Sequence, residues 1–322
     1  MTGSLRVVFC ARETAAHDWS TALQSALAQR GVPADIWWRD AGCADVDPAA
    51  VQADVAVVWR PPAALFTEQH QLRAIFNLGA GVDALLAIPH LPPQAALFRL
   101  EDAGMARALS EYVLAAVLRV YRRFDRYAVH QAAHRWQPEP VPARDDYAVG
   151  VLGLGVIGSA VAATLAQHGF AVRGHARTRK SIAGVDSYAG AVEFGGFLDG
   201  LDMLVTVLPA TAETRGMLDH AALARLARGA HIVNVGRGSA LIERDLLALL
   251  DAGHLGGATL DVFDAEPLPA AHPYWRHPSI LLTPHVAAET ELRAAIEQVA
   301  DKLALWSRGD AVSGAVDRAR GY

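Results

Sequence analysis

Short apolar runs rich in β-branched residues alternate with helical segments along most of this 322-residue chain. Parallel strands need a helical crossover between them, and a sheet covered on both faces has strands that read as continuous apolar runs. The alternation therefore predicts an α/β protein. The expected strands are residues 5–10, 34–38, 54–59, 73–78, 147–152, 171–176, 202–209, 230–236, 256–263 and 279–284. The expected helices are residues 14–30, 104–134, 219–227, 243–252 and 286–308.

The length predicts two domains at roughly 150 residues each. We expect two Rossmann-like or flavodoxin-like doubly wound parallel-sheet domains with a cleft between them. The long helical stretch 104–134 is followed by a proline-rich loop, residues 134–146, which has no apolar periodicity.

Composition excludes several classes of protein. The net charge of −5 argues against a nucleic-acid partner bound through its phosphates. Two cysteines, Cys10 and Cys43, are too few for a disulfide scaffold or a multi-cysteine zinc module, and no metal site is expected. No apolar run reaches the roughly 18 residues of a membrane span, and the first ten residues read as a strand rather than a signal peptide. These features predict a cytoplasmic protein with no membrane partner.

A glycine-rich turn follows the strand that ends near residue 152. Its sequence, Gly153-Leu-Gly155-Val156-Ile157-Gly158, lies between a strand and a helix, and a second strand follows. In this context the first glycine permits a tight turn, the second admits a pyrophosphate and the third lets helix and strand pack closely. The motif predicts a dinucleotide-binding loop.

The end of the next strand indicates which dinucleotide binds. An NAD site places an acid there to bind the ribose 2′-hydroxyl, but this chain has Arg177, Arg179 and Lys180, and no acid before Asp186. Guanidinium groups bind a 2′-phosphate, so NADPH is the expected cofactor, with NADH possible. A solvent-exposed basic turn that binds no phosphate is the alternative.

Three charged residues follow later strands of the same series. They are Arg237, Glu266 and His285, in the runs Asn-Val-Gly-Arg-Gly, Asp-Ala-Glu-Pro and Thr-Pro-His. Ligands of open α/β sheets bind at the carboxyl ends of strands, so these side chains can converge.

The motifs together, in this order, resemble the D-isomer-specific 2-hydroxyacid dehydrogenase family over essentially the whole chain, most closely its glyoxylate/hydroxypyruvate reductase A group. The closer match rests on segments starting at Trp59, Leu78, Leu97, Arg177 and Val316, among them Trp-Arg-Pro-Pro and the terminal Val-Asp-Arg-Ala-Arg-Gly-Tyr.

The resemblance implies three catalytic roles. Arg237 would bind the substrate carboxylate, and His285 would be the acid–base group that protonates the carbonyl oxygen during reduction. Glu266 would hold the imidazole and favour its charged form. This set points to a 2-oxo acid/2-hydroxy acid couple.

The resemblance also implies binding residues. Gly79, Ala80 and Gly81 would meet the carboxylate through backbone N–H groups, and Pro209 and Asp261 would line the nicotinamide. Trp59 and Trp275 either line the substrate pocket or belong to the core. The chain departs from the family pattern at Arg60 and Glu289, where His and an uncharged residue are usual. These departures bear on substrate identity, and Arg60 would favour a more anionic substrate.

The family organisation implies a substrate domain of residues 1–98 plus 287–322 and a cofactor domain of residues 99–286. The implied activity is NADPH-dependent reduction of glyoxylate and hydroxypyruvate by a homodimer in which Trp136 reaches the partner's active site. Two alternatives stay open. One is a reductase for a larger 2-oxo acid, and the other is a dinucleotide-sensing binding protein or corepressor on the same fold.

Overall fold

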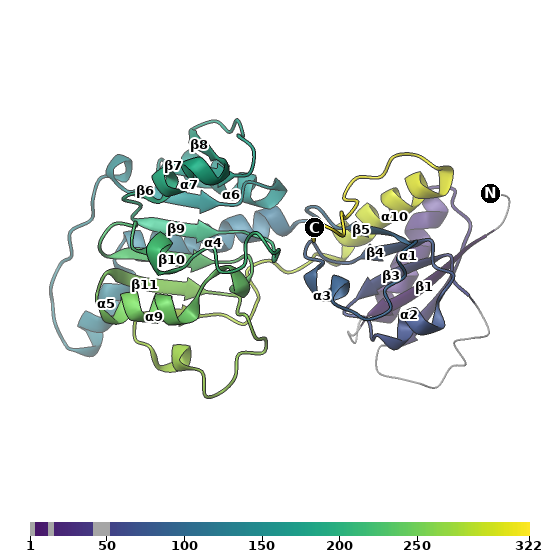
Figure 1. Ribbon diagram of the computed structural model, residues 1–322, viewed down its shortest axis with the longest axis horizontal. Helices are drawn as coiled ribbons and strands as arrows, with labels where there is room; N and C mark the ends of the chain where they lie inside the picture. The colour runs from purple at the N-terminus through teal and green to yellow at the C-terminus, as the bar shows by residue number, and fades with distance from the viewer. Residues whose placement is uncertain (1–3, 12–15, 41–51) are drawn as a thin grey trace. The chain divides into compact units, whose positions relative to one another are not determined.

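Two compact α/β units form the computed structural model, which describes residues 4–11, 16–40 and 52–322 (Figure 1). Unit 1 comprises Met1–Gly104 and Thr290–Tyr322, and unit 2 comprises Met105–Glu289. Each contains one parallel sheet, so the predicted fold class of two parallel-sheet α/β domains is confirmed. Cys43 lies outside the described residues. Within the described ranges, no helix is long and apolar enough to cross a membrane.

The sheet of unit 1 has the order β2-β1-β3-β4-β5, which is the flavodoxin-like order. Its central strands are continuous apolar runs because helices cover them, and all of β4 is buried. The strands are β1 (Leu5–Ala11), β2 (Ala34–Asp40), β3 (Val55–Trp59), β4 (Ala74–Asn77) and β5 (Ala96–Arg99). The helices are α1 (Ala16–Gln29), α2 (Ala64–Glu68), α3 (Asp83–Leu86) and α10 (Leu292–Arg308).

The last helix returns the chain to unit 1. Helix α10 packs against α1. Arg30, just past the end of α1, donates to Glu297 at 2.6 Å and to Asp301 at 2.7 Å on α10. The expected helix 286–308 begins later than predicted, at Leu292. The segment before it belongs to the loop that carries His285, where the N–H groups of Val286 and Ala287 bind the Asp261 carboxylate.

The C-terminal tail runs antiparallel to β5. The N–H of Arg99 donates to the carbonyl of Gly314 at 3.0 Å, and the N–H of Val316 donates to that of Leu97 at 2.8 Å. Lys302 of α10 is buried and donates to the carbonyls of Arg99 and Ser313 at 2.8 and 2.9 Å. One lysine thus fixes both β5 and the tail.

The sheet of unit 2 has the order β12-β11-β10-β9-β6-β7-β8, with every neighbouring pair parallel. Strands β7 and β8 are added on one side of β6, and β9 to β12 are added on its other side. The strand order therefore reverses between β6 and β9, as in dinucleotide-binding folds. The strands are β6 (Ala148–Leu152), β7 (Ala171–Ala176), β8 (Val185–Ala189), β9 (Met203–Thr206), β10 (Ala230–Asn234), β11 (Leu255–Leu260) and β12 (Ile280–Leu282). The helices are α4 (Met105–Tyr121), α5 (Phe124–Ala132), α6 (Val156–Gln167), α7 (Gly190–Leu198), α8 (His220–Leu223) and α9 (Glu243–Asp251).

The predicted single helix 104–134 is wrong in one respect, because the chain forms two helices there. Arg123 adopts the left-handed conformation with φ of 62°, which interrupts the α-helical hydrogen bonds between α4 and α5. The following proline-rich loop folds back. Tyr121 donates to the carbonyl of Pro142 at 2.8 Å and Arg123 to that of Pro140 at 3.1 Å.

Candidate active site and cofactor loop

Three neighbouring strands of unit 2 are each followed by a segment that carries one of the three charged residues. Arg237 follows β10, Glu266 follows β11 and His285 follows β12, and these strands are adjacent in the sheet. Parallel strands share one carboxyl edge, so the three residues lie at the same edge. The glycine loop follows β6 at this edge as well.

His285 and Glu266 form a hydrogen-bonded pair. The imidazole Nδ1 lies 2.7 Å from Oε2 of Glu266, and Oε1 accepts from the N–H of Phe263 at 2.9 Å. Burial raises the pKa of Glu266, but the bonds from His285 and Phe263, with the charges of His285 and Arg237, bring it below its ordinary value. The carboxylate therefore stays ionised at neutral pH, and Nε2 is the ring nitrogen left for a ligand.

Asp261 anchors the loop that carries His285. Its carboxylate is buried and accepts from the Thr283 hydroxyl at 2.6 Å and from the N–H groups of Val286 and Ala287 at 2.8 and 2.9 Å. The N–H of His285 donates to the carbonyl of Asp261 at 2.9 Å. These bonds hold His285 at a left-handed φ of 58°, which costs free energy in a residue with a Cβ.

The turn that carries Arg237 is shaped by Asn234, the buried last residue of β10. The Asn234 amide donates to the carbonyl of Arg237 at 3.2 Å and accepts from the N–H of Gly236 at 3.2 Å. A Cβ on Gly238 would lie 1.9 Å from the carbonyl carbon of Phe263. Only glycine at position 238 lets the turn after β10 approach the loop that carries Glu266.

Each glycine of the loop after β6 has its own role. Gly153 has φ of 103°, a conformation that L side chains rarely adopt. A Cβ on Gly158 would lie 1.8 Å from the carbonyl oxygen of Gly153, so the start of α6 packs against the turn only without a side chain. A Cβ on Gly155 would meet nothing within 4 Å. The backbone at Gly155 and the following Val156 and Ile157, which open α6, is thus open to a ligand at a helix N-terminus and fits a pyrophosphate.

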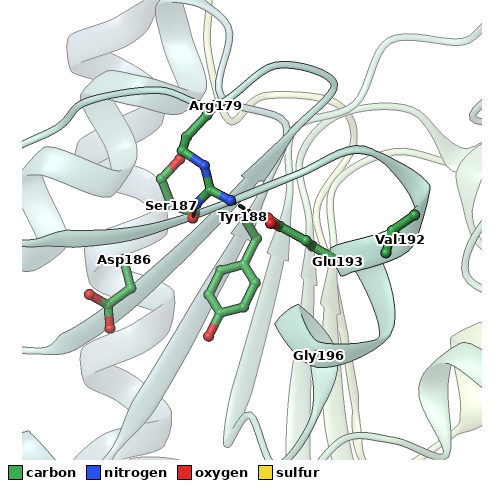
Figure 2. Close-up of a pocket in the computed structure, with 7 residues that line it drawn as sticks. All are labelled: Arg179, Asp186, Ser187, Tyr188, Val192, Glu193 and Gly196. Carbon is green, nitrogen blue, oxygen red and sulfur yellow. Dashed lines mark hydrogen bonds and ion pairs between the residues drawn. The ribbon is translucent and has the colours of Figure 1, made fainter.

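The basic turn follows β7. Arg177 is the first residue after the strand, and Arg177, Arg179 and Lys180 are all exposed. Arg179 contacts the carbonyl of Ser187 on β8 and the carboxylate of Glu193 on α7, beside a hollow of about 570 Å³ (Figure 2). The structure thus places three cations at the end of β7, and Arg179 among them pairs with Glu193.

The predicted carboxylate loop lies in unit 1, after β4. Buried Asn77 donates from its amide to the carbonyls of Gly79 and Gly81 at 3.0 and 2.9 Å. A Cβ on Gly79 would lie 2.3 Å from the ring of Trp59, so this indole packs directly on the loop. Arg60 stacks on that indole at 5.6 Å and has φ of 48°. Asn77 draws the loop carbonyls toward the sheet.

The remaining predicted residues lie at the surface. Trp275 is exposed and donates from Nε1 to the carbonyl of Pro269 at 2.9 Å. Pro209 is exposed after β9, and Glu289 is exposed at the end of unit 2. Trp136 is fully exposed in the proline-rich loop. Among the described residues, no group of three or more His, Cys, Asp or Glu side chains is arranged to hold a metal.

Sequence reasoning missed the residues that position the site. They are Asn77, Asn234 and Glu193, and for Asp261 the sequence did not reveal its anchoring role. Each acts on backbone groups or on a side chain distant in sequence, so no short motif marks it. The only signal was a polar residue at the end of an apolar strand, as at Asn77, Asn234 and Asp261.

Comparisons with known proteins bear on this geometry. The family model described as D-isomer specific 2-hydroxyacid dehydrogenase, NAD binding domain, matches residues 114–287. Glyoxylate/hydroxypyruvate reductase A of Serratia proteamaculans (strain 568) is 44% identical over 312 residues, covering 95% of this chain and 96% of that protein.

Two solved structures extend the likeness to the whole fold. One is a D-isomer specific 2-hydroxyacid dehydrogenase from Xanthobacter autotrophicus Py2 in complex with NADPH and MES, with a TM-score of 0.90, 39% identity and coverage of 99% of this chain and 100% of that one. The other is an NADPH-dependent glyoxylate/hydroxypyruvate reductase from Sinorhizobium meliloti in complex with NADP and sulfate, with a TM-score of 0.88, 33% identity and the same coverage.

The chain belongs to the D-isomer specific 2-hydroxyacid dehydrogenase family, and residues 114–287 match the NAD-binding domain of that family. Within the family, it is similar to glyoxylate/hydroxypyruvate reductases over nearly its whole length.

Proposed function

We propose that this protein is an NADPH-dependent reductase of small 2-oxo acids, converting glyoxylate to glycolate and hydroxypyruvate to glycerate. The observation that carries the proposal is the 2.7 Å pair of His285 and Glu266 at the strand edge shared with Arg237 and the glycine loop. The names of the Serratia and Sinorhizobium relatives support the substrates, and NADPH or NADP in two similar structures supports the cofactor.

The chain's own residues would act as follows. NADPH, when bound, supplies the hydride that reaches carbon 2 of the substrate. The Arg237 guanidinium binds the substrate carboxylate through paired N–H groups and draws electron density from the adjacent carbonyl. Charged His285 donates the proton from Nε2 to the carbonyl oxygen as the hydroxyl forms. Ionised Glu266 holds Nδ1 and leaves Nε2 available to the substrate.

Each unit has residues with a proposed binding role. We propose that residues 1–98 plus 287–322 form the substrate domain and residues 99–286 the cofactor domain. The Gly79–Gly81 loop would contribute N–H groups to the carboxylate, which the fixed direction of its carbonyls supports. Gly153, Gly155 and Gly158 would hold the pyrophosphate. The turn of Arg177, Arg179 and Lys180 would bind the 2′-phosphate, and Pro209 and Asp261 would lie beside the nicotinamide.

The test is oxidation of NADPH, and then of NADH, by the purified protein with 2-oxo acids of increasing size. We expect kcat/KM for glyoxylate and hydroxypyruvate to exceed that for phenylpyruvate by at least about tenfold, because the Trp59 indole packs directly on the loop proposed to bind the carboxylate and would leave little room there for an aromatic side chain. The measurement is the decrease in absorbance of the reduced cofactor under initial-rate conditions.

Three other outcomes are informative. Phenylpyruvate reduced as efficiently as glyoxylate would favour a reductase for larger 2-oxo acids. No turnover with any 2-oxo acid, together with tight cofactor binding, would favour a dinucleotide-sensing protein. A preference for a substrate with a second anionic group would indicate that Arg60 binds that group.

We also propose a homodimer formed through the cofactor domain, with Trp136 near the active site of the partner. Exposed apolar side chains support it, since Phe124, Val129, Trp136 and Val141 all lie on α5 and the loop after it. Sedimentation velocity at micromolar concentration should show a species of about twice the 34.3 kDa chain mass. A fully active monomer would contradict this assembly, and Trp136→Ala should weaken the dimer.

A further inference from the structure

Helix α7 contributes an acid to the basic turn. The guanidinium of Arg179 donates from one terminal nitrogen to the carbonyl of Ser187 and from the other to Oε1 of Glu193, as the dashed contact in Figure 2 shows. Both ends of the guanidinium are therefore occupied within the protein itself. We refer to Arg179 and Glu193 as the turn ion pair.

Glu193 is held in place independently of Arg179. Its second oxygen, Oε2, accepts from the N–H of Ala189 at 2.6 Å, and Ala189 is the residue that precedes α7. The turn is also tied to β8, because the N–H of Lys180 donates to the Ser187 hydroxyl at 3.0 Å. The negative charge of Glu193 is thus fixed beside the turn rather than free to swing into solvent.

A phosphate and a carboxylate compete for the same donors. Strong phosphate binding by arginine uses two parallel N–H groups directed at two oxygens. In the turn ion pair, one terminal nitrogen of Arg179 already donates to the carboxylate of Glu193. The negative charge of Glu193 also repels any anion that approaches Arg179. A 2′-phosphate must therefore displace Glu193 or bind with fewer contacts.

We infer that Glu193 is a specificity-determining residue, which lowers the affinity of the basic turn for the 2′-phosphate by competing for Arg179. The inference rests on the proposed function, in which this turn binds NADPH. Glu193 weakens NADPH binding and leaves NADH binding unchanged, so it reduces the selectivity that three cations alone would give. The chain keeps access to both cofactors in this way.

Calorimetric titration of the full chain with adenosine 2′,5′-bisphosphate and with 5′-AMP tests the inference. Glu193→Gln keeps an oxygen that can accept from Ala189 but removes the charge. It should bind the bisphosphate about two- to tenfold more tightly, the range for losing an exposed opposing ion pair and a nearby like charge, with 5′-AMP unchanged.

Asp199→Asn is the matched control. Asp199 follows the last residue of α7 and pairs with Arg225, so this variant removes one negative charge from the other end of the same helix. It should leave the affinity for both probes unchanged. The gain in bisphosphate affinity from Glu193→Gln should vanish in an Arg179→Ala background, because the competition acts through Arg179.

The outcomes separate the inference from the proposed function. If Glu193→Gln binds the bisphosphate no more tightly than the wild type, the inferred competition is overturned. It is also overturned if the gain in bisphosphate affinity persists in the Arg179→Ala background. A wild-type chain that does not prefer the bisphosphate to 5′-AMP overturns instead the assignment of the basic turn to the 2′-phosphate.

Discussion

Replacing His285 with Asn is expected to lower kcat for glyoxylate reduction by about 10²–10⁴-fold, the usual contribution of a general acid. The variant loses the proton donor at Nε2, while Asn tolerates the left-handed backbone at this position (φ of 58°) better than most residues. The fold should therefore survive, and NADPH affinity should stay close to that of the wild type. Steady-state kinetics and cofactor titration measure the two quantities separately.

His90→Asn is a matched control, because His90 is also exposed and also has a positive φ, of 63°. It exchanges the same side chains in the same backbone region, but in unit 1 and outside the proposed site. We expect its kcat to be unchanged. Near-wild-type kcat in His285→Asn would show that another group protonates the substrate.

Replacing Arg177 with Asp should reduce kcat/KM for NADPH by at least about tenfold and leave kcat/KM for NADH nearly unchanged. The cofactors differ by one 2′-phosphate, and a charge-assisted hydrogen bond to it contributes about 1.5–3 kcal/mol. Arg177 is exposed at the end of β7, so salt weakens its attraction. Initial rates with both cofactors at low and at physiological ionic strength measure the effect.

Arg228→Asp makes the same charge change at another exposed site of unit 2 and should alter neither cofactor's kinetics. Equal wild-type efficiency with NADPH and NADH would contradict the assignment of the basic turn. An equal loss for both cofactors in Arg177→Asp would point to a structural role for the residue instead.

Most strands could be predicted from the sequence because helices bury them on both faces. Strands β1, β3, β6 and β10 are mostly apolar and almost entirely buried for this reason. Strand β8 was missed because it lies at the edge of its sheet and is only partly buried, so Val-Asp-Ser-Tyr-Ala carries no apolar run. The break at Arg123 was missed because neither glycine nor proline marks it.

The candidate site also has a part that could be predicted from the sequence and a part that could not. Its glycine loop and its three charged residues occur in short motifs at strand ends, so their grouping at one edge could be predicted from the order of the strands. The supporting bonds could not be predicted in this way. The carboxylate of Asp261 binds a loop 22 to 26 residues further along the chain, and Glu193 meets an arginine 14 residues before it. Only the folded chain defines such distant pairs.

The C-terminal tail also closes a sheet edge on which another chain could otherwise aggregate. Strand β5 is the last strand of its sheet, and an open sheet edge is a template on which another chain can add a strand. The tail already takes these hydrogen bonds through Gly314 and Val316, and Lys302 holds it in place. Proteolytic loss of the tail would expose the β5 edge and would make the folded unit 1 prone to aggregate through strand addition.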